Sequence, residues 1–183
     1  MEKKIAGVSI ACRQGDIANQ EAYDAVVNAA NAQLETGGGV AGAIHRAAGP
    51  GLANEARPMG PIKPGEAVIT GGHRLPNKYV IHCLGPVYGQ DRPEAELLAN
   101  CYSNALDLAE EKEIDSIAFP AISTGIFGYP MEEAAKVAFE TVIQKIPELQ
   151  HVKKILFVLH SIHDLQLHER VLQQILDGKS YPE

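Results

Sequence analysis

The stretch from residue 24 to residue 49 constrains the fold of this chain most, because it joins an apolar segment to three consecutive glycines. Residues 25–27 predict a strand, the glycines occupy residues 37–39, and the small residues from Val40 onward suit a helix. Glycine has no Cβ, so its N–H group can closely approach an anion, and a helix start adds unpaired N–H groups. The stretch therefore predicts a phosphate-binding loop, with a flexible connection as the alternative.

Apolar runs and helical spacings alternate along the chain. Strands are predicted over residues 4–12, 24–30, 66–70, 78–84, 114–121 and 155–159, and helices over residues 40–56, from Pro93 onward, after Pro130 and over residues 165–176. The Gly-Pro-Gly at residues 49–51 is expected to break the first helix, and residues 57–65 are expected to form a loop. This alternation predicts an α/β fold with helices on both faces of a sheet and residues 1–183 in one domain.

A second junction of strand, loop and helix occupies residues 114–130. Open α/β sheets bind their ligands at the carboxyl ends of the strands, so the two loops are expected to face each other and hold a diphosphate. Gly125 and Ile126 would offer backbone N–H groups to it. Ser123 and Thr124 could contact the same ligand or could simply be turn-forming residues.

The charge and the cysteine content narrow the possible partners. A net charge of −7 argues against a nucleic-acid partner, which usually requires a basic surface. Cys12, Cys83 and Cys101 form no metal-ligand pattern, so reduced thiols and a cytoplasmic location are predicted. The seven histidines match no zinc motif, and the sequence contains no membrane-spanning run and no signal-peptide region, so neither a metal nor a membrane is expected.

Several polar residues have an ordinary structural explanation. Asp16 follows the first predicted strand, where an aspartate commonly forms an Asx turn or a helix cap. His82 lies inside an apolar strand and is expected to be a hydrogen-bonded core histidine, and Asn28 is also expected to be structural. His45 and Arg46 are expected at the surface or at a helix cap, with phosphate contact as the less favoured role.

Four motifs occur in a characteristic order: Gly-Asp-Ile at residues 15–17, Val-Asn-Ala-Ala-Asn at 27–31, Gly-Gly-Gly-Val at 37–40 and Ile-Ser-Thr-Gly-Ile-Phe-Gly at 122–128. In these motifs, and over nearly its whole length, the chain resembles the macro domains, a family that binds ADP-ribose, and most of all the bacterial MacroD-like group. The resemblance implies a three-layer α/β/α macro-domain fold with a mixed central sheet.

The resemblance also implies a role for each matching residue in a cleft across the sheet. Asp16 and the amide of Ile17 would bind adenine, and His160 occupies the position where many relatives place an aromatic ring that stacks on it. Asn31 would contact the terminal ribose, where it is the expected catalytic residue. The diphosphate would be held by Gly38, Gly39, Val40, Ser123, Thr124, Gly125, Ile126 and Phe127, with Phe127 also lying against the terminal ribose.

One departure from the family pattern bears on catalysis. The MacroD-like hydrolases carry an aspartate one residue after Gly-Gly-Val, where this chain has Ala41, and alanine cannot activate a water molecule. Loss of a general base typically lowers a rate ~10²–10⁴-fold. The favoured hypothesis is a slow hydrolase that acts on mono-ADP-ribosylated protein or on O-acetyl-ADP-ribose, with a water held by Asn31 and deprotonated by the phosphate of the ligand.

Two alternatives remain open. The protein could be a non-catalytic reader of free or protein-linked ADP-ribose, since family members without the aspartate include both binders and hydrolases. A different nucleotide-phosphate binder, such as a phosphatase, would fit the glycine loops but would leave the Asn28 to Asn31 pattern unexplained. The expected partners are ADP-ribose, an ADP-ribosylated protein or O-acetyl-ADP-ribose, and a monomer without cofactor or metal is expected.

Overall fold

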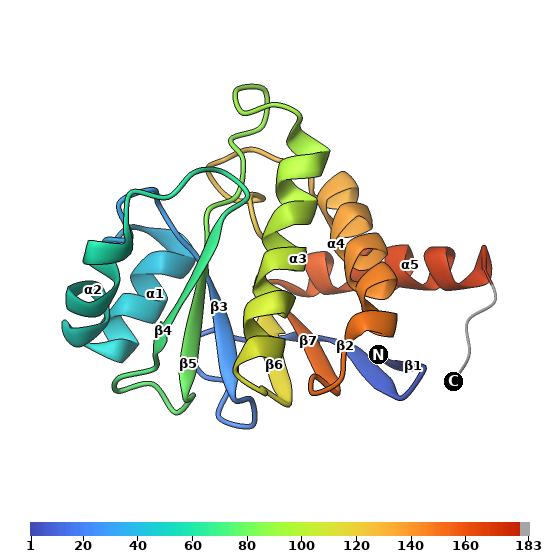
Figure 1. The fold of residues 1–183 in the computed structure, drawn as a ribbon. Coiled ribbons are helices and arrows are strands. Elements are labelled where there is room, and N and C mark those ends of the chain that lie inside the picture. Colours follow the sequence, from blue (N-terminus) through green and yellow to red (C-terminus); the bar gives the residue numbers. More distant parts are fainter. Residues whose placement is uncertain (180–183) are drawn as a thin grey trace.

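Strands and helices alternate in the computed structural model of the protein, which describes residues 1–179 (Figure 1). The strands are β1 (Glu2–Ile5), β2 (Val8–Gln14), β3 (Ala25–Ala29), β4 (Ala67–Gly71), β5 (Tyr79–Cys83), β6 (Ser116–Phe119) and β7 (Lys154–Leu159). The helices are α1 (Gly39–Ala48), α2 (Gly51–Ala56), α3 (Glu94–Glu111), α4 (Met131–Lys145) and α5 (Ile162–Asp177), with the short 3₁₀ helices η1 (Arg57–Met59) and η2 (Ile146–Glu148).

All seven strands form one sheet in the order β1-β2-β7-β6-β3-β5-β4. Strands β2, β7, β6, β3 and β5 run parallel, and the edge strands β1 and β4 pair antiparallel with their neighbours. The predicted mixed sheet is therefore confirmed. Because the five central strands are parallel, the loops that follow them all leave from the same side of the sheet, which we call the carboxyl edge.

Helices cover the two faces of the sheet unequally and form three layers with it. Helices α3, α4 and α5 pack on one face over the larger core cluster, which contains the rings of Tyr102, Phe119, Phe139 and Phe157. Helices α1 and α2 pack on the other face over a smaller cluster that includes Ile44, Ala48 and Leu52. The predicted three-layer α/β/α arrangement is confirmed.

Proline and glycine end the elements where the sequence predicts. Helix α1 ends before Gly49 and α2 begins after Pro50, so the predicted break is confirmed. Helices α3 and α4 begin directly after Pro93 and Pro130. The last helix begins at Ile162, three residues before the prediction, because Ser161 caps it: the Ser161 Oγ accepts a hydrogen bond from the Asp164 N–H at 3.1 Å.

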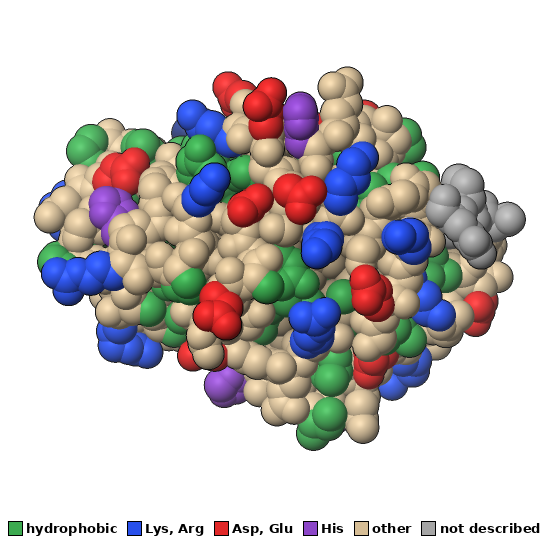
Figure 2. Space-filling view, turned by 90° about the horizontal axis from the view of Figure 1, so that it is seen from below, with side chains coloured by type: hydrophobic (Ala, Val, Ile, Leu, Met, Phe, Trp, Pro, Cys, Tyr) green, Lys and Arg blue, Asp and Glu red, His purple; other side chains and the backbone are tan. Residues whose placement is uncertain are grey.

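Two predictions of local structure were wrong. The strand predicted over residues 4–12 is a hairpin of β1 and β2, because Ala6 and Gly7 form a tight turn with φ of 48° and 81°. Residues 57–65, predicted as a loop, begin with η1. Within residues 1–179, no helix combines the length and the apolarity that a bilayer span requires. Figure 2 shows acidic and basic side chains interspersed over the underside of the molecule.

His45 was predicted at the surface or at a cap, and the structure places it in the interior. Helix α1 buries Ala41, Ile44, His45 and Ala48, a spacing that forms one continuous stripe along a helix. The stripe packs towards the sheet, and the His45 side chain is only 5% exposed. The sequence did not predict this burial, because histidine is polar and commonly lies where the apolar face of a helix meets solvent.

Candidate functional site

The predicted ligand residues lie along the carboxyl edge, which is at the top of Figure 1. Asp16 follows β2, His160 follows β7, the loop of residues 121–130 follows β6, and Asn31 follows β3. These four strands are consecutive in the sheet. They span three strand spacings of about 4.8 Å, or roughly 14 Å, so the residues form a line suited to an elongated ligand.

The glycine loop presents unpaired backbone donors at the start of α1. Among the described residues, the N–H groups of Gly38, Gly39 and Val40 have no hydrogen-bond partner, and no side chain caps the helix. A Cβ added at Gly38 or Gly39 would meet no atom within 4 Å, so both positions face open space. Gly39 has a φ of 57°, which glycine adopts without strain. The helix start is thus an exposed anion-binding site.

The loop after β6 offers a second set of donors. Within the described part of the chain, the N–H groups of Gly125, Ile126 and Phe127 have no partner, and Ile126 is 99% exposed. The hydroxyl groups of Ser123 and Thr124 do not face outward. Thr124 Oγ1 donates to the Ala121 carbonyl at 2.7 Å, and Ser123 is only 6% exposed. The backbone of this loop, more than its hydroxyls, is therefore available to a ligand.

Apolar packing joins this loop to the segment after β3. Phe127 is partly buried and packs against a small cluster composed of Ala30, Leu34, Ala56, Ile62 and Leu84. Ala30 and Leu34 flank Asn31, so the Phe127 ring holds the two loops next to each other. The strands that precede the two loops, β3 and β6, are paired neighbours, so both loops leave the same part of the carboxyl edge.

The loop after β5 also belongs to this region, and the sequence analysis missed it. The Tyr88 N–H donates to the Phe127 carbonyl at 2.8 Å, and the Tyr88 ring lies 4.9 Å from that of Tyr129. A Cβ at Gly85 would overlap the Ser123 hydroxyl oxygen. The signal was present in the sequence, because residues 78–84 were a predicted strand and Gly85 and Pro86 follow its carboxyl end.

The Asn31 side chain is committed to its own loop. Its Nδ2 donates to the Glu35 carbonyl at 2.9 Å, and its Oδ1 accepts from the Glu35 N–H at 3.0 Å. Arg57 of η1 then binds the Glu35 carboxylate, with 3.1 Å between Nε and Oε1. Each amide atom of Asn31 retains one further proton or lone pair for a ligand.

The predicted adenine end lies at the carboxyl ends of β2 and β7. Asp16 forms an Asx turn, in which Oδ1 accepts from the Ala18 N–H at 2.9 Å, so the ordinary structural role is real. Its second carboxylate oxygen is free for another donor. The Ile17 side chain is buried in the smaller core cluster. His160 is exposed, and its carbonyl accepts from Gln14 Nε2 at 3.5 Å.

Ala41 lies in the first turn of α1, directly behind the glycine loop. It is 5% exposed, and a Cβ built on Gly37 would lie 3.8 Å from the Ala41 Cβ. Gly42 permits this close approach, because a Cβ there would come within 2.6 Å of the Gly37 carbonyl oxygen. A larger side chain at position 41 would therefore project towards Gly37, and so towards Asn31, whose Nδ2 lies 3.3 Å from a Cβ at Gly37.

A buried polar chain lies beneath the site. Asn28 Nδ2 contacts His82 Nδ1 at 3.1 Å, and His82 Nε2 contacts Thr70 Oγ1 at 3.0 Å. An amide nitrogen only donates, so Nδ1 is unprotonated and Nε2 carries the proton. Burial, with a smaller contribution from His45, lowers the pKa of His82 to about 3. The predictions that Asn28 and His82 are structural core residues are confirmed.

In residues 1–179, no group of three His, Cys, Asp or Glu side chains is arranged to bind a metal ion. The three cysteines Cys12, Cys83 and Cys101 are buried and free. The candidate site consists of backbone N–H groups, the Asp16 carboxylate, the Asn31 amide and the rings of Phe127 and His160.

Comparison with known proteins gives a consistent result. The family model described as the macro domain matches residues 27–138. The O-acetyl-ADP-ribose deacetylase of Salmonella typhimurium is 48% identical over 166 residues, which cover 88% of this chain and 92% of that protein.

Two solved structures share the fold. The Oceanobacillus iheyensis macrodomain with ADP has a TM-score of 0.92 and 40% identity, covering 98% of this chain and 97% of that one. The Trypanosoma brucei macrodomain in complex with ADP-ribose has a TM-score of 0.82 and 35% identity, covering 88% of this chain and 68% of that one.

Proposed function

This chain belongs to the macro domain family, and from that premise we propose that it binds ADP-ribose along the carboxyl edge and slowly hydrolyses ADP-ribosyl esters. The substrates would be mono-ADP-ribosylated protein or O-acetyl-ADP-ribose. The names of its relatives support this class of ligand: one is an O-acetyl-ADP-ribose deacetylase, and two solved neighbours hold ADP and ADP-ribose.

The observation that carries the proposal is that the loops after the paired strands β3 and β6 each carry unpaired N–H groups. Gly38, Gly39 and Val40 present one set, and residues 125–127 present the other. These N–H groups are exposed to solvent, and the helix start adds its positive dipole end to one of the two sets, an arrangement that favours an anionic ligand. Two sets fit the two phosphates of a diphosphate. The net charge of −7 makes this local donor geometry the main source of attraction.

Asn31 would orient the water at the terminal ribose. Its amide retains one proton and one lone pair beyond the bonds to Glu35, so it can hold a water molecule or a ribose hydroxyl. In this proposal the phosphate of the ligand accepts the proton of the attacking water, because position 41 offers only a methyl group. The water oxygen forms a bond to the acyl carbon, the bond from that carbon to the ribose oxygen breaks, and the proton held by the phosphate passes to the ribose oxygen. The products are ADP-ribose and acetate, or ADP-ribose and a protein with a free carboxylate.

The buried Ala41 side chain is the specific observation that favours a second candidate, a non-catalytic reader of ADP-ribose. With no carboxylate at this position, ligand binding would persist while general-base assistance, typically ~10²–10⁴-fold, is absent. The hydrolase remains the favoured proposal because Asn31 and Phe127, which would contact the terminal ribose, are both retained.

Titration calorimetry with ADP-ribose tests the binding proposal. We expect micromolar or tighter affinity for ADP-ribose and much weaker binding of AMP, which lacks the second phosphate and the terminal ribose. Absence of heat and of any thermal shift with ADP-ribose would refute the proposed ligand.

Release of ADP-ribose from a glutamate-linked target, and of acetate from O-acetyl-ADP-ribose, tests the activity. Rates above the buffer control are expected on at least one of them. Buffer-level rates on both, together with intact ADP-ribose binding, would decide for the reader.

Three further features stay proposals. We propose a cytoplasmic location, which the three free, buried cysteines support. The single-domain extent of residues 1–183 and the monomeric state predicted from the sequence also remain predictions.

A further inference from the structure

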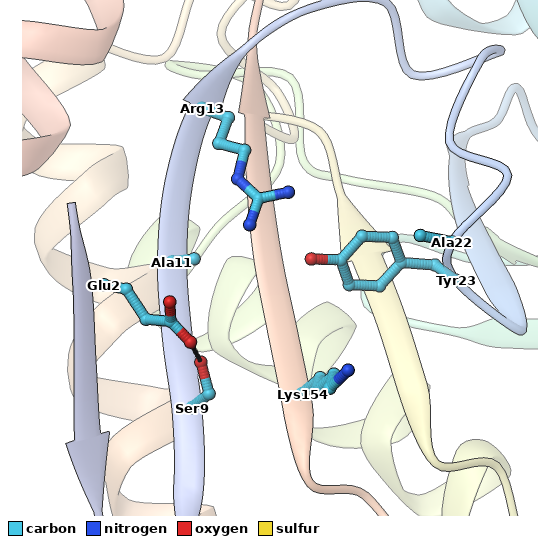
Figure 3. Close-up of a pocket in the computed structure, with 7 residues that line it drawn as sticks. All are labelled: Glu2, Ser9, Ala11, Arg13, Ala22, Tyr23 and Lys154. Atoms are coloured by element: carbon cyan, nitrogen blue, oxygen red, sulfur yellow. Dashed lines mark hydrogen bonds between the residues drawn. The ribbon is translucent and has the colours of Figure 1, made fainter.

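One end of the sheet has an uncovered face. Helix α5 packs on β2 and β7 from one side, whereas α1 and α2 cover the other side only towards β3 and β4. On this second side, a hollow of about 280 Å³ lies over β1, β2 and β7 (Figure 3). Its lining residues are Glu2, Ser9, Ala11, Arg13, Ala22, Tyr23 and Lys154.

The strand register explains how the hollow forms. Ser9, Ala11 and Arg13 alternate along β2 and so share one face, and Lys154 lies beside Ser9 on β7. Ala11 is the small residue between two longer side chains, and its short side chain leaves the floor of the hollow low. Glu2, opposite Ala11 on β1, forms the outer wall.

Tyr23 closes the hollow from the other side and is held rigidly. The ring is 8% exposed, and Asn77 Nδ2 donates to the Tyr23 and Gln20 carbonyls at 2.7 Å each. Figure 3 shows the Tyr23 hydroxyl and the Arg13 guanidinium pointing towards each other across the hollow. This wall is a fixed part of the fold, because its backbone is bonded to a buried asparagine.

The hollow is positively charged in an acidic protein. Arg13 and Lys154 take part in no ion pair among residues 1–179, whereas the single carboxylate, Glu2, accepts a hydrogen bond from Ser9 Oγ at 2.6 Å. Lys4 adds a third cation beside Ser9 on the same face. An open sheet face in a chain of net charge −7 would ordinarily carry both signs, so this local excess of cations favours an anion.

We propose that this hollow binds the phosphomonoester of a sugar-sized molecule, at a site separate from the carboxyl edge. The Arg13 guanidinium and the Lys154 ammonium bind the phosphate, because a planar fork of donors and a point charge both match phosphate oxygens. Glu2, Ser9 and Tyr23 supply an acceptor and two hydroxyls for the hydroxyl groups of the sugar. A volume of about 280 Å³ accommodates a ligand of this size.

Two-dimensional amide NMR with ribose 5-phosphate as the probe tests the site, with ribose and inorganic phosphate titrated in parallel at constant ionic strength. Saturable shifts are expected at the amides of residues 9–13 and 154, with millimolar or tighter affinity for ribose 5-phosphate. Ribose should produce no saturable shift, and phosphate should bind more weakly than ribose 5-phosphate.

A charge-matched pair of variants separates the site from general electrostatics. Arg13→Gln with Lys154→Gln should weaken binding about tenfold or more, because two charge-assisted contacts are lost. Lys112→Gln with Lys153→Gln removes the same charge from exposed positions outside the hollow, and its affinity should stay within about twofold of wild type. Urea denaturation checks that both variants keep their fold.

Three results would overturn the proposal. The first is the absence of saturable shifts in the hollow, including the case in which ribose 5-phosphate shifts only residues 37–40 and 123–128. The second is equal weakening in both double variants. The third is equal affinity for phosphate and ribose 5-phosphate, which would leave an anion site without sugar recognition.

Discussion

The side-chain amide of Asn31 is hydrogen-bonded at both of its polar atoms to the backbone of Glu35. The residue expected to face the terminal ribose therefore also stabilises the loop that leads into the glycines. Since Arg57 binds the Glu35 carboxylate, these interactions connect the loop to η1. Changes at Asn31 must consequently be analysed for loop stability and for ligand contact separately.

We expect Asn31→Ala to destabilise the protein by ~1–3 kcal/mol, since two hydrogen bonds of about 0.5–1.5 kcal/mol each are lost. The hydrolysis rate should fall by more than ADP-ribose affinity, because an oriented water matters chiefly in the transition state. Urea denaturation, calorimetry and a rate assay measure the three effects. Gln33→Ala, an exposed change in the same loop, is the control. Unchanged binding and rate would assign Asn31 to loop structure alone.

Asp16→Asn separates the two roles of Asp16. The amide oxygen of asparagine can still accept from the Ala18 N–H, so the Asx turn and the stability should persist. ADP-ribose binding should weaken by ~1–3 kcal/mol, because a charged acceptor for the adenine amine is lost. Calorimetry measures the loss, with Asp16→Ala as the variant that removes both roles. Wild-type affinity in Asp16→Asn would show that Asp16 serves only the turn.

Gly38→Glu should abolish ADP-ribose binding in a folded protein. Position 38 has φ of −90° and no atom within 4 Å of a Cβ, so a side chain fits without backbone strain. The added carboxylate would lie beside the free N–H groups and repel the diphosphate. Gly38→Gln has nearly the same size without the charge and should retain more affinity. Equal binding by both variants and wild type would place the diphosphate elsewhere.

Ala41→Asp should raise the turnover of O-acetyl-ADP-ribose, by up to ~10²-fold, by supplying a general base near Asn31. The carboxylate also suits the first turn of α1, where it meets the positive end of the helix dipole. Ala41→Asn is the matched control without the base and should show no gain. Steady-state rates measure the effect, and an equal gain in both variants would mean that packing, not base catalysis, had changed.

Stability should fall as the pH is lowered from about 6.5. The pKa of His82 is about 3 in the folded protein and 6.5 in the unfolded chain. Between these two pH values, the unfolded chain therefore binds one more proton at this histidine than the folded protein does. The loss is about 1.4 kcal/mol per pH unit for one such histidine. Burial also lowers the pKa of His45, which adds in the same direction.

Urea denaturation between pH 6.5 and 5 measures this loss of unfolding free energy. This pH range lies above the usual pKa values of carboxylates. His82→Gln should lower stability at pH 7 yet reduce the slope against pH. An unchanged slope in His82→Gln would show that His82 does not carry the pH dependence.

The sequence was sufficient to predict the fold because the residues that begin and end its elements act locally. Proline at 50, 93 and 130 marks the start of a helix through its fixed φ and missing N–H, and each predicted boundary is close to the observed one. The β1–β2 turn was missed because only Gly7 marks it in the sequence, and the other turn residue, Ala6, adopts a positive φ of 48° that alanine rarely takes. Such a turn depends on the sheet pairing around it, which no local pattern reports.

The candidate site was less predictable, because its parts come from distant segments. The carboxyl-end rule predicted that the two glycine-containing loops share one edge, and the resemblance to macro domains added Asp16, Asn31 and His160. It did not reveal that Glu35 would hold both ends of the Asn31 amide, since that bond depends on the exact path of the loop. The burial of His45 likewise follows from how α1 is rotated against the sheet.

Gly85 has a consequence for mutational scanning. Ser123 has a φ of 69°, and its hydroxyl packs directly against the Cα of Gly85, so a side chain at position 85 would force the side chains of Ser123 and Ile122, in the loop after β6, to shift. In a screen scored by activity alone, position 85 would rank among the most sensitive sites while supplying no atom to ligand or chemistry. The sensitivity of position 85 to substitution would report how closely the loops after β5 and β6 pack. A parallel screen scored by protein abundance would not detect this sensitivity if the substitution moved the loop without unfolding the protein.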